Sequence, residues 1–152
     1  MASAVAVFNR FNVFAQNLAK GVHNLDGSPP TNVLKVMLTD VAPVVTNTVF
    51  ANITEIAAGN GYTAGGAALV SPTGTLIGLQ EVLASNQVVF TASGGAIAQF
   101  RYAVLYDSTP TSPLKPLIGW WDYGSEFIVA DTANFTITFA GLVTAGTILT
   151  LG

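Results

Sequence analysis

The run AQFRYAVLYD at residues 98–107 is the strongest strand signal in the chain, because it joins aromatic and aliphatic residues without a break. In an extended strand, successive side chains point to opposite faces. We therefore expect the core face of this strand to be formed by Phe100, Tyr102, Val104 and Tyr106. The other face then carries Arg101, Ala103, Leu105 and Asp107.

Similar short runs lie on both sides of this strand, divided by Gly, Pro, Ser and Asn. They predict strands at 34–39, 67–70, 75–79, 88–92, 98–107, 117–123, 127–129, 134–140 and 147–151. A parallel α/β fold is disfavoured, since no helical pattern separates the runs. The spacing predicts a mainly β protein, an antiparallel β-sandwich with a jelly-roll-like arrangement, in one domain that spans residues 1–152.

Two adjacent tryptophans, Trp120 and Trp121, stand within the predicted strand at 117–123. Adjacent residues of a strand face opposite sides, so a two-layer fold can bury only one of the two rings in its own core. The other ring packs beneath a loop or helix, or it anchors an interface, where aromatic residues are enriched. The sequence leaves both alternatives open, and it does not say which ring faces the core.

One short helix is predicted over residues 9–20, near the N-terminus. Its apolar stripe comprises Phe8, Phe11, Phe14 and Leu18, at helical spacing. Asn9 is a suitable N-cap, and Gly21 is a suitable end signal. The stripe packs on the core of its own chain or docks on a neighbouring subunit.

Residues 41–66 form the longest connection, rich in Asn and Gly. A connection of this length in a compact domain is often functional or ordered by a partner. The alternative is a mobile surface loop.

Charge is scarce in this chain: only 9% of its 152 residues are charged and 51% are hydrophobic, with a net charge of -3. Soluble domains carry about 25% charged residues, so we expect other copies or other chains to cover part of the surface. The bases are scattered, which disfavours direct nucleic-acid binding. No run of 18 apolar residues predicts a membrane span. Because the chain has no cysteine, its stability must come from packing or assembly.

No catalytic, cofactor or metal site is predicted. His23, the only histidine, is expected to be a hydrogen-bonded structural residue. Asp122, Glu126 and Asp131 lie close in sequence, but Gly124–Ser125 indicates a turn. We therefore expect these acids to be solvated residues in or near a turn. A small hydrolase that uses His23 or these acids is the least favoured hypothesis, because convergent polar groups are missing.

The runs 8–25, 34–39, 100–107 and 119–124 resemble a family of small tailed-bacteriophage virion proteins, and the chain is similar to the cement, or decoration, proteins of phage capsids. The resemblance implies a jelly-roll-like body that forms a dimer or trimer and bridges subunits of the major capsid protein on the capsid exterior, without catalysis. The candidate interface residues are Phe8, Phe11, Phe14, Leu18, Trp120 and Trp121. The alternative is a tail- or fibre-associated adhesin that binds a host-surface glycan through Trp120 or Trp121.

Overall fold

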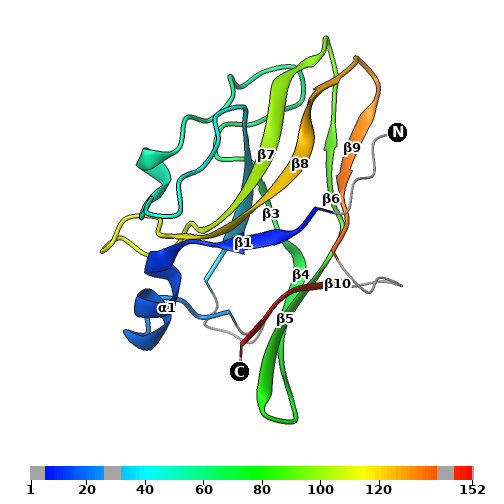
Figure 1. Ribbon diagram of the computed structural model, residues 1–152. Coiled ribbons are helices and arrows are strands. Elements are labelled where there is room, and N and C mark those ends of the chain that lie inside the picture. Colours follow the sequence, from blue (N-terminus) through cyan, green and yellow to red (C-terminus); the bar gives the residue numbers. More distant parts are fainter. Residues whose placement is uncertain (1–5, 26–31, 140–145, 152) are drawn as a thin grey trace.

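The computed structural model describes residues 6–25, 32–139 and 146–151 (Figure 1). The protein is mainly β, with antiparallel sheets and one short α-helix, as the sequence predicts. Its elements are β1 (Phe8–Arg10), α1 (Asn12–Ala19), β2 (Leu34–Thr39), the 3-10 helix η1 (Phe50–Asn52), β3 (Ala67–Ala68), β4 (Val70–Ile77), β5 (Gln80–Asn86), β6 (Val88–Thr91), β7 (Ile97–Asp107), β8 (Leu117–Val129), β9 (Asn134–Ile137) and β10 (Gly146–Leu151).

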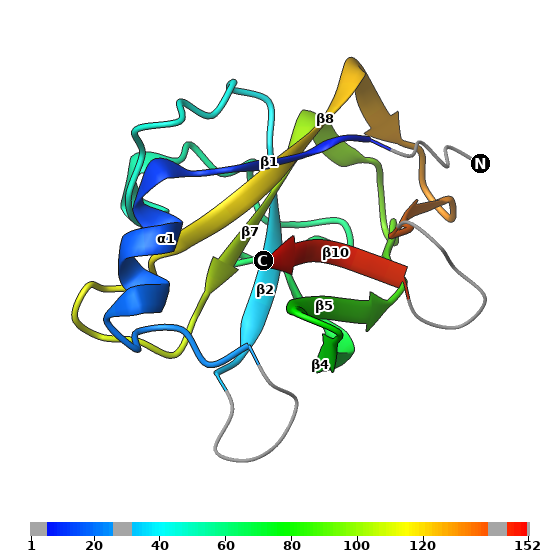
Figure 2. The same cartoon turned by 60° about the horizontal axis from the view of Figure 1, so that its bottom comes forward.

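The strands form three sheets, and every pairing between them is antiparallel. The largest sheet has the order β1-β8-β7-β2-β3, the second has the order β10-β5-β4, and β6 pairs with β9. Buried side chains from all three sheets meet in one hydrophobic cluster. The arrangement is therefore sandwich-like (Figures 1 and 2). A jelly roll in the strict sense stays a prediction.

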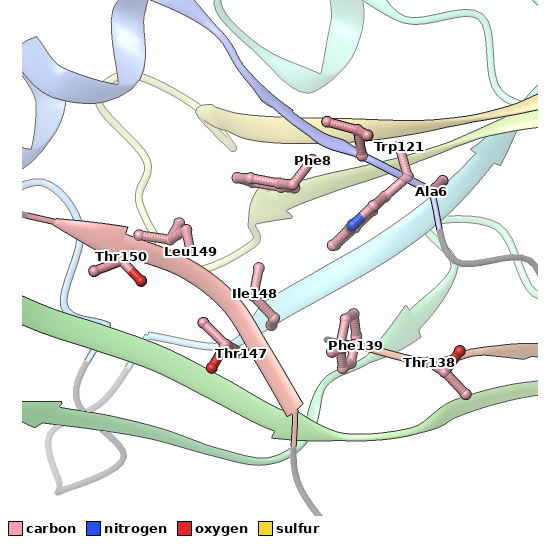
Figure 3. Close-up of a pocket in the computed structure, with 10 residues that line it drawn as sticks. Ala6, Phe8, Trp121, Thr138, Phe139, Thr147, Ile148, Leu149 and Thr150 are labelled. Atoms are coloured by element: carbon pink, nitrogen blue, oxygen red, sulfur yellow. The ribbon is translucent and has the colours of Figure 1, made fainter. Parts of the chain in front are cut away.

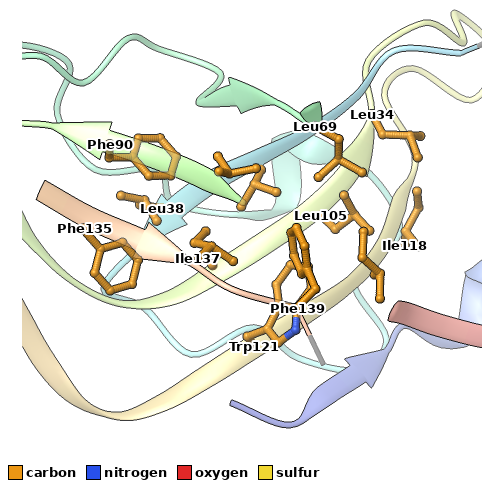
Figure 4. Close-up of a cluster of buried hydrophobic side chains, with 14 of the residues drawn as sticks. Leu34, Leu38, Leu69, Phe90, Leu105, Ile118, Trp121, Phe135, Ile137 and Phe139 are labelled. Atoms are coloured by element: carbon orange, nitrogen blue, oxygen red, sulfur yellow. The ribbon is translucent and has the colours of Figure 1, made fainter. Parts of the chain in front are cut away.

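The main core lies between the large sheet and the two smaller ones (Figure 4). Leu38, Leu105 and Trp121 contribute to it from the large sheet, while Phe90 and Phe135 contribute from the β6–β9 pair. The rings of Phe100 and Phe135 meet edge to face, with their centroids 4.8 Å apart. These contacts hold the layers together without a disulfide, since the chain has no cysteine.

A second, smaller core lies on the opposite face of the large sheet. Its buried members are Phe11, Met37, Ile53, Val104, Tyr106 and Leu117. Ile53 comes from the 41–66 connection and Phe11 directly precedes α1, so these two segments cover the outer face of the sheet. Strands β2 and β7 are consequently buried on both faces along most of their length.

The alternation predicted for β7 is therefore wrong in two respects. First, both faces of the strand are buried, not one. Second, the main core contains Ala103 and Leu105, from the face expected to lie outside it, while Val104 belongs to the smaller core. Phe100 joins Ala103 in the main core, although the two residues differ by an odd number of positions. The cause is a register shift between Phe100 and Tyr102 in the pairing with β8, which changes the phase of the strand.

The 41–66 connection is held to the sheet by hydrogen bonds within its own chain, and a functional role for it stays a prediction. The Tyr62 hydroxyl donates to Glu55 Oε1 at 2.6 Å and accepts a hydrogen bond from the Leu38 amide at 3.0 Å. The Gly65 amide donates to the same Glu55 oxygen at 2.6 Å. Tyr106 of β7 donates to the Gly65 carbonyl at 2.7 Å. This network fixes the connection to β2 and β7.

The N-terminal segment differs from the prediction of one helix over 9–20. Residues Phe8–Arg10 form β1, which pairs with β8, and α1 begins only at Asn12 with Phe11 as its N-cap. Gly119 explains the early strand, because a Cβ atom there would collide with the Phe8 ring and the Asn9 carbonyl. The predicted end is correct. Gly21 has φ +70° and, with the next residue, Val22, closes a Schellman motif by donating to the Leu18 and Asn17 carbonyls.

Two predictions of strand boundaries are also wrong. Strand β8 runs without interruption through Gly124–Ser125, where the sequence indicated a turn. Gly124 has φ +78°, and the pairing with β7 skips residues between Asp122 and Phe127, so the glycine marks an irregularity within the strand. The predicted strand at 75–79 is part of a hairpin, in which β4 turns at Gly78–Leu79 into β5, a strand that the sequence analysis missed.

Candidate functional site

His23 forms a buried hydrogen-bonded pair with Asp107, as expected for a structural histidine. The distance from His23 Nδ1 to Asp107 Oδ2 is 3.0 Å, and both side chains are fully buried. Asp107 also accepts from Asn32 Nδ2 at 2.6 Å and from the Thr109 amide at 3.2 Å. The pair joins the segment after α1 to the end of β7. Within the described residues, His23 Nε2 has no hydrogen-bond partner, so no nucleophile is placed for activation by the imidazole.

The three neighbouring acids do not form a carboxylate pair. Asp122 lies in β8 and makes a two-point contact with Arg101 of β7, with nitrogen to oxygen distances of 2.8 and 3.0 Å. Arg101 lowers the pKa of the Asp122 carboxyl, and the Gly124 amide, which donates to the same carboxylate, adds to this effect. Glu126 and Asp131 are exposed. Asp122 is thus an ion-paired strand residue and not a turn acid.

Two buried tyrosines, Tyr62 of the main core and Tyr106 of the smaller core, have raised pKa values. Burial is the main cause at Tyr62, and its hydrogen bond to Glu55 raises the pKa further. Burial together with the nearby Glu55 raises the pKa of Tyr106 to about 12. Both phenols therefore stay protonated and act as hydrogen-bond donors over the physiological pH range. Their role in the structure is to attach the 41–66 connection to the sheet.

Metal-ligand clusters and membrane-spanning helices are both absent from the described residues. No group of three or more His, Asp or Glu side chains converges as a metal site in the described ranges. In the same part of the chain, no helix has both the length and the apolar character needed to cross a membrane.

The two tryptophans point to opposite sides of β8, as the strand geometry predicts. Trp121 is buried in the main core, where its ring lies 4.9 Å from that of Phe8 and 5.5 Å from that of Phe139. Trp120 is half-buried and packs against Phe11, with ring centroids 4.5 Å apart. The core-facing ring is therefore Trp121, and the other is partly covered by the start of α1.

The six candidate interface residues lie together around β1, α1 and β8, but the structure buries half of them within the chain. Phe11, Phe14 and Trp121 are core residues, which corrects the view of them as surface contacts. Phe8, Leu18 and Trp120 are half-buried. The apolar stripe of the helix thus packs on the core of its own chain, which was the first of the two predicted alternatives.

Three strongly exposed apolar side chains stand together at a place that the sequence analysis did not select. We use the term hairpin tip for Leu76, Ile77, Gly78 and Leu79, at the turn between β4 and β5. Leu76 is 70% exposed, Ile77 61% and Leu79 95%. Figure 1 shows this hairpin extending away from the body below β10. No charged residue stands between Val70 and Gln80. The available signal was the sequence LIGLQ, which is apolar on both sides of a turn glycine.

A second apolar surface is the groove between β1 and β10, which are the terminal strands of their two sheets. We call it the edge groove; its volume is about 390 Å³, and none of the described residues that line it is charged. Phe8, Trp121, Phe139, Ile148 and Leu149 form its apolar wall (Figure 3). Thr138 also lines it, and among the described residues its buried hydroxyl has no hydrogen-bond partner. The groove opens the main core to the surface at one edge of the sandwich.

Comparison of the chain with models of protein families, with curated proteins and with solved structures finds no match.

Proposed function

We propose that this protein is a non-enzymatic structural protein of a bacteriophage virion, and that it acts as a capsid cement protein on the major capsid protein lattice. The observation that carries the proposal is the hairpin tip: three exposed apolar side chains in the segment Val70–Gln80, which contains no charged residue. Exposed apolar groups gathered at one place mark contact surfaces. The sequence resemblance to phage virion proteins supports a virion as the assembly to which this surface binds.

The physical requirements of a cement protein agree with this chain. Each contact in a lattice buries ~800 Å² per partner, and the stability of the assembly is the sum over many copies. A surface with 9% charged residues has few ions to desolvate when it is covered. The net charge of -3 and the scattered bases suit an exterior position, since a DNA-facing surface requires an excess of Lys and Arg.

Two experiments test the placement. Cryo-EM of virions that contain this protein should show its density on the outer capsid surface, between subunits of the major capsid protein. Density confined to the tail or baseplate contradicts the proposal.

Capsids that lack the protein should melt at a higher temperature when the purified wild-type chain is added. Leu79→Asp should remove this gain, whereas Ile128→Asp should keep it, because Ile128 is similarly exposed at 64% but lies on β8 away from the hairpin tip. Equal behaviour of the two variants removes the hairpin tip from the contact.

The second candidate function is the glycan-binding adhesin. Because Trp121 is buried, Trp120 is the tryptophan that remains as its candidate glycan contact. This ring is half-buried and lies on the outer face of the large sheet, the same face as the Arg101–Asp122 pair. Binding to a glycan array that disappears in Trp120→Ala and persists in Leu79→Asp favours the adhesin. Capsid binding by the wild-type chain without glycan binding eliminates it.

A further inference from the structure

The turn at residues 59–62 contains the only asparagine of the sequence that is followed by glycine, Asn60 before Gly61. Gly59 and Tyr62 pair across this turn, and the amide of each donates to the carbonyl of the other at 2.9 Å. The two central residues, Asn60 and Gly61, have φ values of +52° and +91°. Positive φ at both central positions is typical of a type I′ turn, in which Asn-Gly is a preferred pair. Both residues are exposed to solvent.

Asparagine is a thermolabile residue, and a following glycine makes it more reactive. The glycine amide nitrogen can attack the Cγ carbon of the asparagine side chain, because glycine has no β-carbon that hinders the approach. The new N–Cγ bond closes a five-membered succinimide ring, and the side-chain nitrogen leaves as ammonia with the proton of the glycine amide. Water then opens the ring at either carbonyl carbon and gives aspartate or isoaspartate. Water is therefore the only other reactant.

We propose that Asn60 is a site of spontaneous deamidation, and that this reaction releases the 59–62 turn from the segment that precedes β7. Asn60 is exposed, so water has access to its side chain. The Gly61 amide is the attacking group, and it makes no hydrogen bond to any described residue. The reaction therefore does not need to displace a partner of the nucleophile. This inference does not depend on a role in a virion.

The Asn60 side chain holds two segments of the chain together before it reacts. Asn60 Nδ2 donates to the Ala96 carbonyl at 2.8 Å, and a Cβ atom at Gly95 would lie 3.0 Å from the Asn60 amide group. The Asn60 carbonyl accepts a hydrogen bond from the Ser93 amide at 3.0 Å. These contacts attach the turn to the connection between β6 and β7. Because Nδ2 is the atom that leaves as ammonia, deamidation removes the donor of the contact with Ala96.

Neither product can restore this contact. An aspartate at position 60 has two carboxylate oxygens, which only accept hydrogen bonds, and the Ala96 carbonyl opposite them also only accepts. An isoaspartate adds a methylene group to the main chain, which a two-residue turn cannot hold while Gly59 and Tyr62 remain paired. The Tyr62 hydroxyl is one of the groups that attach the connection to β2. Reaction at Asn60 therefore loosens this attachment as well.

Two other asparagines of the same connection, Asn47 and Asn52, lack this combination of features. They are followed by Thr48 and Ile53, whose β-branched side chains hinder attack by the amide nitrogen. Their contacts also use the side-chain oxygen in place of the nitrogen. Asn47 Oδ1 accepts from the Val44 amide at 2.8 Å, and Asn52 Oδ1 accepts from the Thr48 amide at 3.0 Å. An aspartate keeps such an acceptor, so these residues are matched controls.

The first experiment follows the reaction in the wild-type chain. The folded protein is incubated in mildly alkaline buffer beside a sample unfolded in urea, and peptide mapping by mass spectrometry with isoaspartate detection locates each modified asparagine. In the folded sample, Asn60 should be modified before Asn47 and Asn52. The reaction should be about tenfold slower than in urea, because the contacts of the turn must open first. Earlier modification of another asparagine overturns the proposal. An unmodified Asn60 when the unfolded sample has fully reacted overturns it as well.

The second experiment measures what the modification does to the turn. Asn60→Asp and Asn52→Asp add the same charge, but only the first removes a hydrogen-bond donor. Hydrogen exchange of the Ser93 amide, which donates to the Asn60 carbonyl, should quicken at least about tenfold in Asn60→Asp. The same amide should exchange at the wild-type rate in Asn52→Asp. Equal rates in the two variants show that the contact with Ala96 does not hold the turn, and they overturn the proposed release.

Discussion

The β7–β8 pair and the β4–β5 hairpin are both antiparallel ladders of adjacent strands, yet their surroundings are opposite. Strands β7 and β8 lie in the middle of the large sheet, with a core on each face. Strand β4 is the terminal strand of its sheet, and nearly all of its residues are exposed. Both strand pairs have the same antiparallel pattern of hydrogen bonds, so hydrogen bonding does not explain why one pair is buried and the other is exposed.

The difference follows from the number of layers that each ladder touches. The smaller sheets cover one face of β7, and the 41–66 connection covers the other, whereas the outer half of the β4–β5 hairpin extends beyond the body of the protein (Figure 1). Apolar residues occur in both ladders. At β7 they stabilise the fold, and at the hairpin tip they are free to stabilise an association. Hydropathy alone does not show whether an apolar residue stabilises the fold or an association between chains.

The largest effect is expected from the tryptophan that faces the main core. Trp121→Ala should lower the free energy of unfolding by about 3–5 kcal/mol, because it leaves a cavity between Phe8 and Phe139. Leu79→Ala should change it by less than about 0.5 kcal/mol, because that side chain is 95% exposed. Urea denaturation of both variants measures the contrast. Trp120→Ala should fall between them, and equal losses for the two tryptophans would break the comparison.

A medium effect is expected from the hydrogen bonds that fasten the cover of β7. Tyr62→Phe leaves the buried Leu38 amide without its acceptor, which should cost about 1–3 kcal/mol of unfolding free energy. Hydrogen exchange should quicken at Leu38 and Gly65 and remain unchanged in β5. The matched control is Tyr123→Phe, whose ring packs against Phe127 and Phe135. A loss no larger than that of the control means that packing alone holds the connection in place.

The smallest effect is expected from the Arg101–Asp122 pair at the half-exposed edge of the ladder. The folded-state pKa of Asp122 is lowered, so the contribution of the pair to stability is complete above the ordinary Asp value of about 3.9 and is lost as pH falls through the lowered value. Asp122→Asn should therefore flatten the fall of Tm with decreasing pH. Asp131→Asn, at an exposed residue, is the control. An unchanged acid slope in Asp122→Asn shows that the pair is screened by solvent.

The sequence predicts the β class well because strand signals are local. The run at 98–107 and the paired tryptophans both depend on the alternation of side chains along one strand. Strand β5 was missed because Gln80, Glu81 and Ala84 have low strand propensity, and its conformation depends on pairing with β4 and β10. Propensity is overridden here by neighbours that are distant in sequence.

The surfaces could be predicted only in part. The sequence indicates apolar residues but not which of them the fold covers, so buried Phe14 and exposed Leu79 carry the same local signal. The network that orders residues 41–66 joins Tyr62 to Leu38 and Tyr106 to Gly65, and such pairings do not follow from spacing along the chain. A strand phase changed by a bulge, as at Phe100, is equally invisible before the register is known.

Adjacent tryptophans on opposite faces of β8 also give the protein a built-in pair of optical probes. Trp121 is buried among apolar side chains of the main core, and Trp120 lies half-exposed beside Phe11. Emission from Trp121 should be blue-shifted and protected from acrylamide, while emission from Trp120 should be red-shifted and quenched. Replacing either one by Phe isolates the other, so a single strand reports separately on the interior of the sandwich and on its outer surface.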